Sequence, residues 1–212
     1  MQKLLHDATT LAKLRDTLED SFSALPLVAS KAEVIPGEGP ENAKVFFIGE
    51  APGQQETIER RPFVGRSGKL FRKTLAEVGI DEKTVYITNI VKARPPENRD
   101  PSVEEILAYK PFLDKEIEIL KPQLIVTLGR FSMAKFLPDV KISQVHGRLH
   151  KVKWNDVTQY VLPMYHPAAA LRSTKMKESF VEDFGKIDKI IDWVGEQQQN
   201  RQFSEEVVAH LF

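Results

Sequence analysis

The sequence predicts an α/β fold, namely a single three-layer α/β/α domain with a central, mostly parallel four-stranded sheet. Two observations lead to this prediction. Short apolar runs typical of buried strands occur at residues 45–48, 85–88, 124–128 and 160–163. Longer segments with apolar residues at helical spacing lie between these runs. Strands that alternate with helices indicate a parallel sheet with helices on both faces.

Five helical segments are expected from the apolar spacing. The first 22 residues carry leucines at helical spacing and predict one amphipathic helix packed on the domain. Ser102, followed by Glu104 and Glu105, marks the start of a longer helix that Pro111 should kink or divide. The expected helices span residues 1–22, 68–78, 102–120, 129–137 and 175–194.

The chain has 212 residues, which is enough for one domain with a sizeable core, and it shows no internal repeat. We expect one α/β domain to occupy residues 1–195. Residues 197–200, Gln-Gln-Gln-Asn, are expected to form a hinge. Residues 196–212 would then form a C-terminal tail, either docked on the domain or flexible.

The composition excludes several classes of protein. Lys plus Arg and Asp plus Glu are both 30, so the net charge is zero and gives no general argument for nucleic acid. The chain has no cysteine, which excludes disulfides and thiolate metal sites. It has no apolar run long enough to span a membrane, and its N-terminus lacks a signal-peptide pattern. We therefore expect a soluble, cytoplasmic monomer without membrane contact.

The ends of three predicted strands carry side chains suited to recognition of a flat heterocycle. Glu50 and Glu56 follow the first strand together with Phe63, Asn89 ends the second, and His166 follows the last. Ligands of open α/β sheets bind at the carboxyl ends of the strands. An aromatic face, a carboxamide and an imidazole would supply stacking and hydrogen bonds to a nucleobase.

Four sequence segments, in matching order and spacing, resemble the motifs of family 4 uracil-DNA glycosylases. The segments are GEAPG, RPFVGRSG, NIVKARPP and YHPAAALR, and the resemblance runs from about Leu25 to Val194. It implies a monofunctional hydrolase of DNA base excision repair. Such an enzyme cleaves the N-glycosidic bond of uracil in DNA and leaves an abasic site.

The resemblance implies a role for each motif residue. Phe63 would stack on the extruded uracil, Asn89 would hydrogen-bond to its O4 and N3 edge, and His166 would donate to O2. Glu50 and Glu56 fall on the acids of the family motif, and either could orient water or stabilise the cationic sugar. Without the family, a core aromatic, a turn asparagine and a structural histidine would be the alternative interpretations.

The first strand end contributes a Gly/Pro turn to the expected pocket. Its backbone amides would contact uracil O2 or a phosphate. In family 1 enzymes an aspartate stands at the position of Ala51, whereas family 4 also has alanine there. The expected substrate-binding residues of this turn are Gly49, Ala51, Pro52 and Gly53.

Basic residues near the strand ends predict a DNA-binding rim. Residues 60–73 hold six basic residues and no acid, although a solvated face is the alternative for single lysines. In relatives a large apolar residue after the histidine wedges into the duplex. Ala170 holds that position here and Leu171 is next, so we expect single-stranded or mismatched DNA to be preferred. The expected DNA contacts are Arg60, Arg61, Arg66, Lys92, Arg94, Ala170, Leu171 and Arg172.

One departure from the family is large. Family 4 enzymes usually bind an iron–sulfur cluster through four cysteines, and the motif spacing places these positions at Phe22, Leu25, Ala93 and Tyr109. None of these residues ligates iron well. We therefore expect packed side chains in the cluster volume and no metal or other cofactor.

Three alternatives remain open from the sequence. The enzyme could act on hypoxanthine or another deaminated base, or the protein could bind uracil or abasic DNA without catalysis. A nucleotide-binding protein unrelated to DNA is the third, but the chain has no GxGxxG or Walker pattern.

Overall fold

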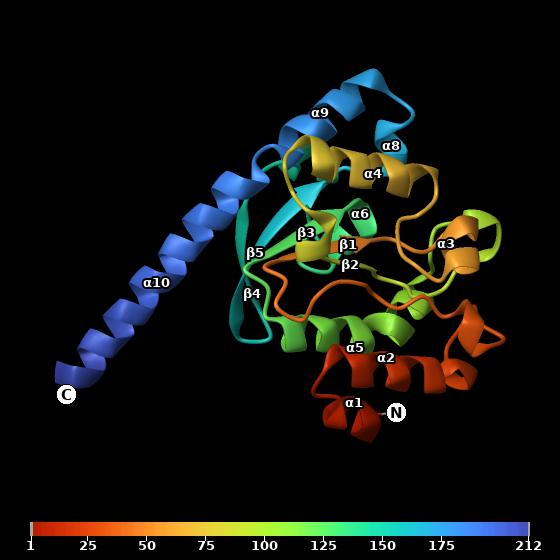
Figure 1. Ribbon diagram of the computed structural model, residues 1–212, viewed down its shortest axis with the longest axis horizontal. Coiled ribbons are helices and arrows are strands. Elements are labelled where there is room, and N and C mark those ends of the chain that lie inside the picture. Colours follow the sequence, from red (N-terminus) through yellow and green to blue (C-terminus); the bar gives the residue numbers. More distant parts are fainter. Residues whose placement is uncertain (1, 212) are drawn as a thin grey trace.

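The structure is a computed structural model that describes the backbone of residues 2–211 and the side chains of residues 2–200. Five strands form one sheet in the order β2-β1-β3-β5-β4, drawn at the centre of Figure 1. The predicted fold class is confirmed, with one strand more than the four expected. The strands are β1 (Val45–Gly49), β2 (Tyr86–Asn89), β3 (Leu124–Leu128), β4 (His150–Trp154) and β5 (Val157–Met164).

Four of the strands are parallel, and this brings their carboxyl ends to one edge of the sheet. Phe47 of β1 is in register with Ile87 of β2 on one side and Val126 of β3 on the other. On the far side of β3, Val126 is in register with Leu162 of β5. Because β1, β2, β3 and β5 are the predicted buried runs, the residues that follow them meet at this edge.

The additional strand, β4, is antiparallel and forms one edge of the sheet. Its residues alternate between half-buried and exposed, as expected for an edge strand with one face in solvent. Lys151 and Lys153 supply the exposed positions. The strand was missed because its charged residues make it look like a basic cluster.

Helices cover both faces of the sheet, which gives the three layers (Figure 1). Phe46 points to one face, where it packs in a cluster with Leu14 and Phe112. Phe47 points to the other face, against Phe71 and Phe184. The first face carries α1 (Gln2–Asp7), α2 (Leu11–Asp20) and α5 (Val103–Leu120), and the second carries α4 (Arg66–Glu77), α9 (Thr174–Phe184) and the start of α10 (Ile187–Leu211).

Shorter helices lie in the connections. The α-helical ones are α3 (Gln54–Glu59), α6 (Arg130–Ala134), α7 (Ile142–Val145) and α8 (Pro167–Ala170). The 3-10 turns are η1 (Phe22–Ala24), η2 (Lys31–Glu33), η3 (Glu82–Thr84) and η4 (Pro96–Asn98).

Three helix predictions need correction. The expected helix 1–22 is two helices, because Thr10 caps the start of α2 by accepting a hydrogen bond from the Lys13 amide. The expected helix 175–194 ends at Phe184, and α10 begins after Gly185 and Lys186. By contrast, α5 is one helix through Pro111, with Ser102 and Glu105 forming a capping box at its start.

The last helix, α10, is continuous through residues 197–200, so the expected hinge is absent there. Its first residues pack on the domain, and the helix then projects away from it (Figure 1). The side chains of residues 201–212 lie outside the described part of the chain, and whether the tail docks stays a prediction.

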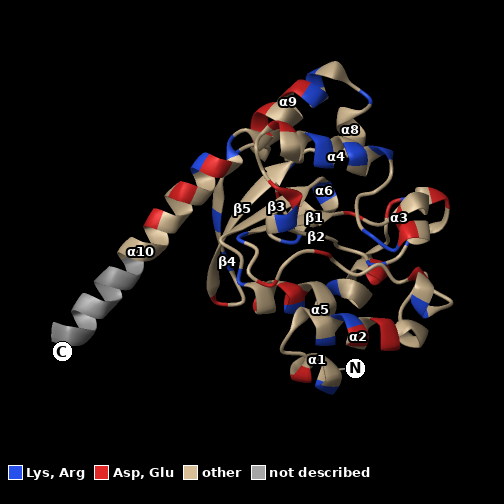
Figure 2. Ribbon diagram, viewed as in Figure 1, with Lys and Arg blue, Asp and Glu red and all other residues tan. Residues whose placement is uncertain are grey.

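Acidic and basic residues are intermixed over the surface of the domain (Figure 2). This mixture agrees with the zero net charge of the sequence. None of the described helices is long and apolar enough to cross a membrane.

Candidate active site

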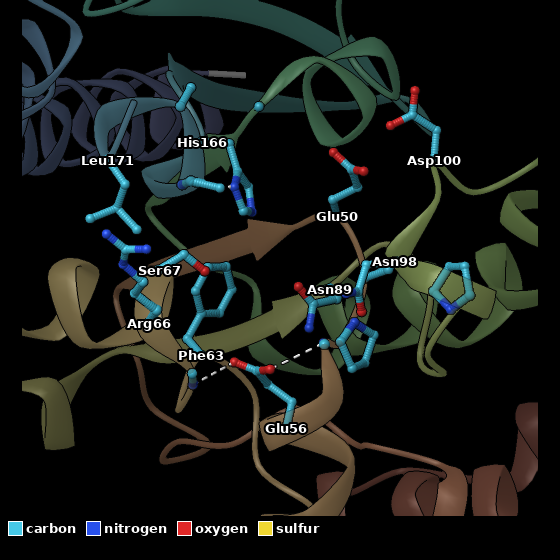
Figure 3. A pocket seen from close by; sticks show the side chains of 18 of the residues that line it. Glu50, Glu56, Phe63, Arg66, Ser67, Asn89, Asn98, Asp100, His166 and Leu171 are labelled. Atoms are coloured by element: carbon cyan, nitrogen blue, oxygen red, sulfur yellow. Dashed lines mark hydrogen bonds between the residues drawn. The ribbon is translucent and has the colours of Figure 1, made fainter. Parts of the chain in front are cut away.

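A cleft of about 750 Å³ opens at the carboxyl ends of the four parallel strands. Its lining comes from the β1–α3 turn, the start of α4, the end of β2, the loop before α5, the start of α6 and the segment after β5. All five side chains singled out from the strand ends lie in this cleft (Figure 3). They are Glu50, Glu56, Phe63, Asn89 and His166.

Gly49 allows two of these side chains to approach β1. A Cβ atom on Gly49 would lie 2.3 Å from the Asn89 Oδ1 atom and 2.3 Å from the Phe63 Cζ atom. Both side chains are buried. Glycine is therefore required at the end of β1, because any side chain there would displace the amide and the ring.

Contacts with α4 hold the Phe63 backbone and ring in place. Phe63 adopts a positive φ of 55°, and Arg72 donates hydrogen bonds to the carbonyl oxygens of Phe63 at 2.9 Å and Pro62 at 2.8 Å. A Cβ atom on Gly68 would lie 2.0 Å from the Phe63 carbonyl carbon, so α4 packs directly on this backbone. The ring centroid lies 5.0 Å from that of Phe71. These contacts fix an aromatic wall of the cleft before any ligand binds.

His166 presents a neutral imidazole to the cleft. Its Nδ1 atom accepts a hydrogen bond from the Ala168 amide at 3.2 Å, which places the ring proton on Nε2. Burial, followed by the nearby charge of Arg172, lowers the pKa of His166 to about 4. The ring centroid lies 6.0 Å from that of Phe63. His166 can therefore donate a hydrogen bond at neutral pH without carrying a charge.

The two motif acids differ in their surroundings. The Glu56 carboxylate accepts three backbone hydrogen bonds, from Gly53 at 3.1 Å, Val64 at 3.0 Å and Gly65 at 2.7 Å. It ties the start of α3 to the loop that carries the aromatic wall. Such a carboxylate is occupied by structural contacts.

Glu50, in contrast, has a carboxylate that no described side chain or backbone amide contacts. No hydrogen bond or ion pair reaches its side chain from residues 2–200, whereas its carbonyl oxygen accepts the Val91 amide at 3.1 Å. Burial, followed by the charge of Asp100, raises the pKa of Glu50 to about 7, against the opposing effect of Arg130. A half-buried carboxyl that titrates near neutrality is suited to proton transfer or to charge stabilisation.

The turn after β1 completes the floor of the cleft. The Gly49 carbonyl oxygen accepts the Ile90 amide at 3.0 Å, which joins the end of β1 to the end of β2. Ala51, Pro52 and Gly53 line the cleft as expected.

Comparison with known proteins agrees with the motif resemblance. The model of the "Uracil DNA glycosylase superfamily" matches residues 36–186, which is more than half of the chain. The chain belongs to this superfamily. Among its relatives, a type-4 uracil-DNA glycosylase of Sulfurisphaera tokodaii is 42% identical over 76% of this chain and 76% of its own length.

Two further relatives of the superfamily carry the same name. The type-4 uracil-DNA glycosylase of Archaeoglobus fulgidus is 40% identical over 76% of this chain and 83% of its own length. That of Pyrobaculum aerophilum is 36% identical over 86% of this chain and 97% of its own length.

In this member of the uracil-DNA glycosylase superfamily, the predicted basic rim is only partly at the cleft. Arg66 and Arg172 line it. Arg60 donates to Glu19 of α2 at 2.7 Å, and Arg61 donates to Glu38 at 2.8 Å, so both are engaged by acids outside the cleft. Arg94 donates to Asn98 at 2.8 Å beside the cleft.

Lys92 was predicted to contact DNA, but its side chain is buried, and this position does not suit such a contact. Its side chain is 0% exposed and donates to Glu116 at 2.6 Å and to Thr88. Glu116 also accepts the Tyr86 hydroxyl at 3.2 Å. The lysine links the loop after β2 to α5, and its partner lies 24 residues away in sequence, which sequence spacing alone did not indicate.

The burial of Ala170 likewise does not suit the predicted wedge position. This residue is 2% exposed and belongs to the core cluster under α4 and α9. Leu171 is exposed and lines the cleft. The apolar side chain available at the rim is therefore Leu171.

The four residues that the motif resemblance places at the cysteine positions of family 4 form part of one apolar cluster. Leu25, Ala93 and Tyr109 are buried in it, and Phe22 packs against it. The Tyr109 hydroxyl donates to the Pro26 carbonyl oxygen at 2.7 Å. These residues do not fit an iron–sulfur cluster, since they offer no thiolate and fill the volume themselves. Among the described residues no group of His, Asp and Glu could hold a metal ion.

Three residues that shape the site were missed from the sequence. Arg72 holds the aromatic wall, and Asp100 and Arg130 face each other at the cleft and form an ion pair. Arg130 follows Gly129 directly after β3, so the strand-end argument applied to all four strands would have found it. Asp100 lies in the loop after β2, beyond the motif that was recognised.

Proposed function

We propose that this protein is a monofunctional uracil-DNA glycosylase that hydrolyses the N-glycosidic bond of uracil in DNA and leaves an abasic site. Membership of the superfamily and the names of its relatives support this function. The observation that carries it is the meeting of Phe63, Asn89 and His166 in one cleft at the carboxyl ends of the strands.

Uracil recognition would rest on Asn89 and Phe63. A carboxamide offers both an acceptor and a donor, so it complements the N3–H and O4 atoms of uracil and mismatches cytosine. The rigid ring of Phe63 supplies a face on which the extruded base stacks. The close packing of both side chains against Gly49 supports a preformed pocket.

Bond cleavage would rest on His166 and Glu50. The departing uracil develops negative charge, and a neutral Nε2–H of His166 that donates to O2 would stabilise it. The sugar develops positive charge, which an ionised Glu50 would stabilise while it orients the attacking water. Water adds its hydroxyl to the sugar C1′ atom, and its proton is taken up by the base or by solvent. The three backbone bonds of Glu56 support a structural role for that acid.

DNA would be held at the rim of the cleft. Arg66 and Arg172 suit contacts to phosphates, and Leu171 is the side chain placed to fill the gap left by an extruded base. A single leucine offsets only part of the cost of opening a base pair. We therefore propose that uracil in single strands and in U·G mismatches is removed faster than uracil paired with adenine.

The remaining features of the proposal follow from this activity. Residues 1–195 would form the glycosylase domain and act as a monomer on DNA in the cytoplasm, with residues 196–212 as a tail. Cytosine would be a poor substrate, because it presents an amino group and an unprotonated N3 atom to Asn89. Hypoxanthine shares the acceptor and donor edge of uracil, so its exclusion would rest on the larger size of the purine ring.

The test is excision under single-turnover conditions, with a chelator present, from oligonucleotides that carry one uracil, one hypoxanthine or only normal bases. We expect alkali-labile sites at uracil alone. The matched control is His166→Ala with Glu50→Gln, which removes both reacting groups and whose folding is checked by circular dichroism. Tight binding without product at stoichiometric protein would instead support a non-catalytic binding protein, and preferred cleavage at hypoxanthine would change the substrate.

A further inference from the structure

Glu50 and Asp100 compete for one of the cations that line the cleft, Arg130. Glu50, Asp100 and Arg130 all line the cleft, and Figure 3 shows the Glu50 and Asp100 side chains there. Arg130 forms its ion pair with Asp100, and no ion pair reaches Glu50 from the part of the chain described with side chains. The unpaired carboxylate is thus the one inside the cleft, and the paired carboxylate is the one at its edge.

The ion pair that competes with Glu50 is weak. The Arg130 and Asp100 side chains are 64% and 62% exposed. Exposed pairs of this kind contribute about 0–1 kcal/mol, so Arg130 can leave Asp100 at little cost. The two residues come from different elements, because Arg130 begins α6 after β3 and Asp100 lies in the loop between η4 and α5.

We infer that Asp100 and Arg130 are positioning residues that together set the charge of Glu50 during uracil excision. Arg130 favours the Glu50 carboxylate, and Asp100 disfavours it, both by its own charge and by holding Arg130. This inference rests on the proposed function, because it assigns a partner pair to the acid of that same site. The electrostatic effects on Glu50 agree in sign, since Asp100 raises its pKa and Arg130 lowers it.

The other charged groups that line the cleft do not replace this pair. Glu56 is held by three backbone amides, and Arg99 is bound through two hydrogen bonds, of 2.9 and 2.6 Å, to Glu105. His166 is uncharged above about pH 4. Asp100 and Arg130 are the charged groups whose effects on the pKa of Glu50 accompany that of burial.

The two residues have opposite predicted effects on the pH profile. Glu50 acts when it is ionised, so excision falls as the pH decreases through its pKa. Asp100→Asn removes a negative charge and frees Arg130, and both changes lower the pKa of Glu50. The acid limb of the pH–rate profile, where the rate falls as the pH decreases, then moves to lower pH. Arg130→Gln removes the positive charge that favours the Glu50 carboxylate, which raises the pKa of Glu50 and moves the acid limb to higher pH. A merely structural role would change the rate of both variants and leave the limb in place.

The first experiment measures single-turnover excision from a single-stranded uracil oligonucleotide between about pH 5 and about pH 9. We expect limb shifts of roughly 1 pH unit in opposite directions for Asp100→Asn and Arg130→Gln. Arg99→Gln is the matched control, because it removes one positive charge from the same cleft, and its limb should stay at the wild-type pH. Equal limbs for all four proteins, or shifts of the same sign, would overturn the inference.

A second readout does not depend on activity. Carbon-13 NMR of the glutamate carboxyl groups, assigned with Glu50→Gln, gives the titration midpoint of Glu50 in the wild type and both variants. Midpoints that shift with opposite signs support the pair even if no uracil is excised, in which case the proposed function alone fails. Midpoints that coincide overturn the inference even if excision is normal.

Discussion

Ala170 and Leu171 are neighbours in the chain, yet the first is 2% exposed and the second is 37% exposed at the rim of the cleft. The residue that the motif resemblance placed at the wedge position is therefore buried in the core. The next residue carries the larger apolar side chain to the surface where DNA would lie. This one-residue offset changes what each substitution should do.

Leu171→Ala should slow uracil excision from U·A duplexes by roughly tenfold more than from single strands. Leucine fills the gap left by the base, and the loss of that apolar burial matters only where a base pair is opened. Single-turnover rates on U·A, U·G and single-stranded substrates measure the effect. Met176→Ala is the matched control, since Met176 is equally exposed at 37% and does not line the cleft. An equal loss on all substrates would exclude the wedge role.

Ala170→Leu should destabilise the protein by about 1–3 kcal/mol, because it adds volume to a packed core. Urea unfolding monitored by circular dichroism measures this change. Ala32→Leu, at an exposed position, provides the control. A stable variant with faster excision from U·A duplexes would instead restore Ala170 as the wedge position.

Asn89→Asp should weaken uracil selectivity. An ionised aspartate accepts hydrogen bonds but donates none, so it opposes O4 of uracil and suits the amino group of cytosine. We expect uracil excision to fall by roughly 100-fold and slow cytosine excision to appear. Rates on matched uracil and cytosine oligonucleotides measure both effects, and Asn42→Asp, at an exposed site, is the control. Unchanged discrimination would place base recognition elsewhere.

His166→Ala should slow the chemical step by roughly 100-fold to 1,000-fold, as for loss of one donor to a developing anion. Because the pKa of His166 is lowered to about 4, its ionisation should not appear in the wild-type profile above about pH 5. Single-turnover rates at saturating protein separate this step from binding. His6→Ala, on the exposed side of α1, should keep the wild-type rate.

Leu25→Ala should destabilise the domain by roughly 2–5 kcal/mol, because Leu25 is buried in the cluster that contains Tyr109. Denaturant unfolding measures the loss. Leu4→Ala is the matched control, since Leu4 is exposed and should change stability by less than about 0.5 kcal/mol. Similar stabilities for the two variants would show that the replacement of cysteine by apolar side chains adds no packing energy.

The sequence supported the fold well where apolar runs were long and continuous. The four parallel strands are buried along most of their length, so apolar residues dominate them and the strands were recognised directly. The edge strand β4 alternates half-buried and exposed residues, and its lysines hid the pattern. Helix ends at Thr10 and Gly185 depend on local capping and on packing that periodicity does not report.

The strand-end argument brought Glu50, Phe63, Asn89 and His166 together correctly, because parallel strands deliver their carboxyl ends to one edge. The sequence did not predict ion pairs between residues that are far apart in the chain. The burial of Lys92 depends on Glu116, and the engagement of Arg60 depends on Glu19, 41 residues earlier in the chain. Sequence spacing alone did not identify these partners.

The hydrogen bond from Tyr109 to the Pro26 carbonyl oxygen has a consequence for how the protein matures. Residues 22–28 are fastened to α5 by packing and one hydroxyl group, which are complete as soon as the chain has folded. Folding around Phe22, Leu25, Ala93 and Tyr109 therefore needs no delivery of iron or sulfide. We therefore expect equal yields of active protein from iron-starved and iron-replete cultures, and unchanged activity after exposure to peroxide.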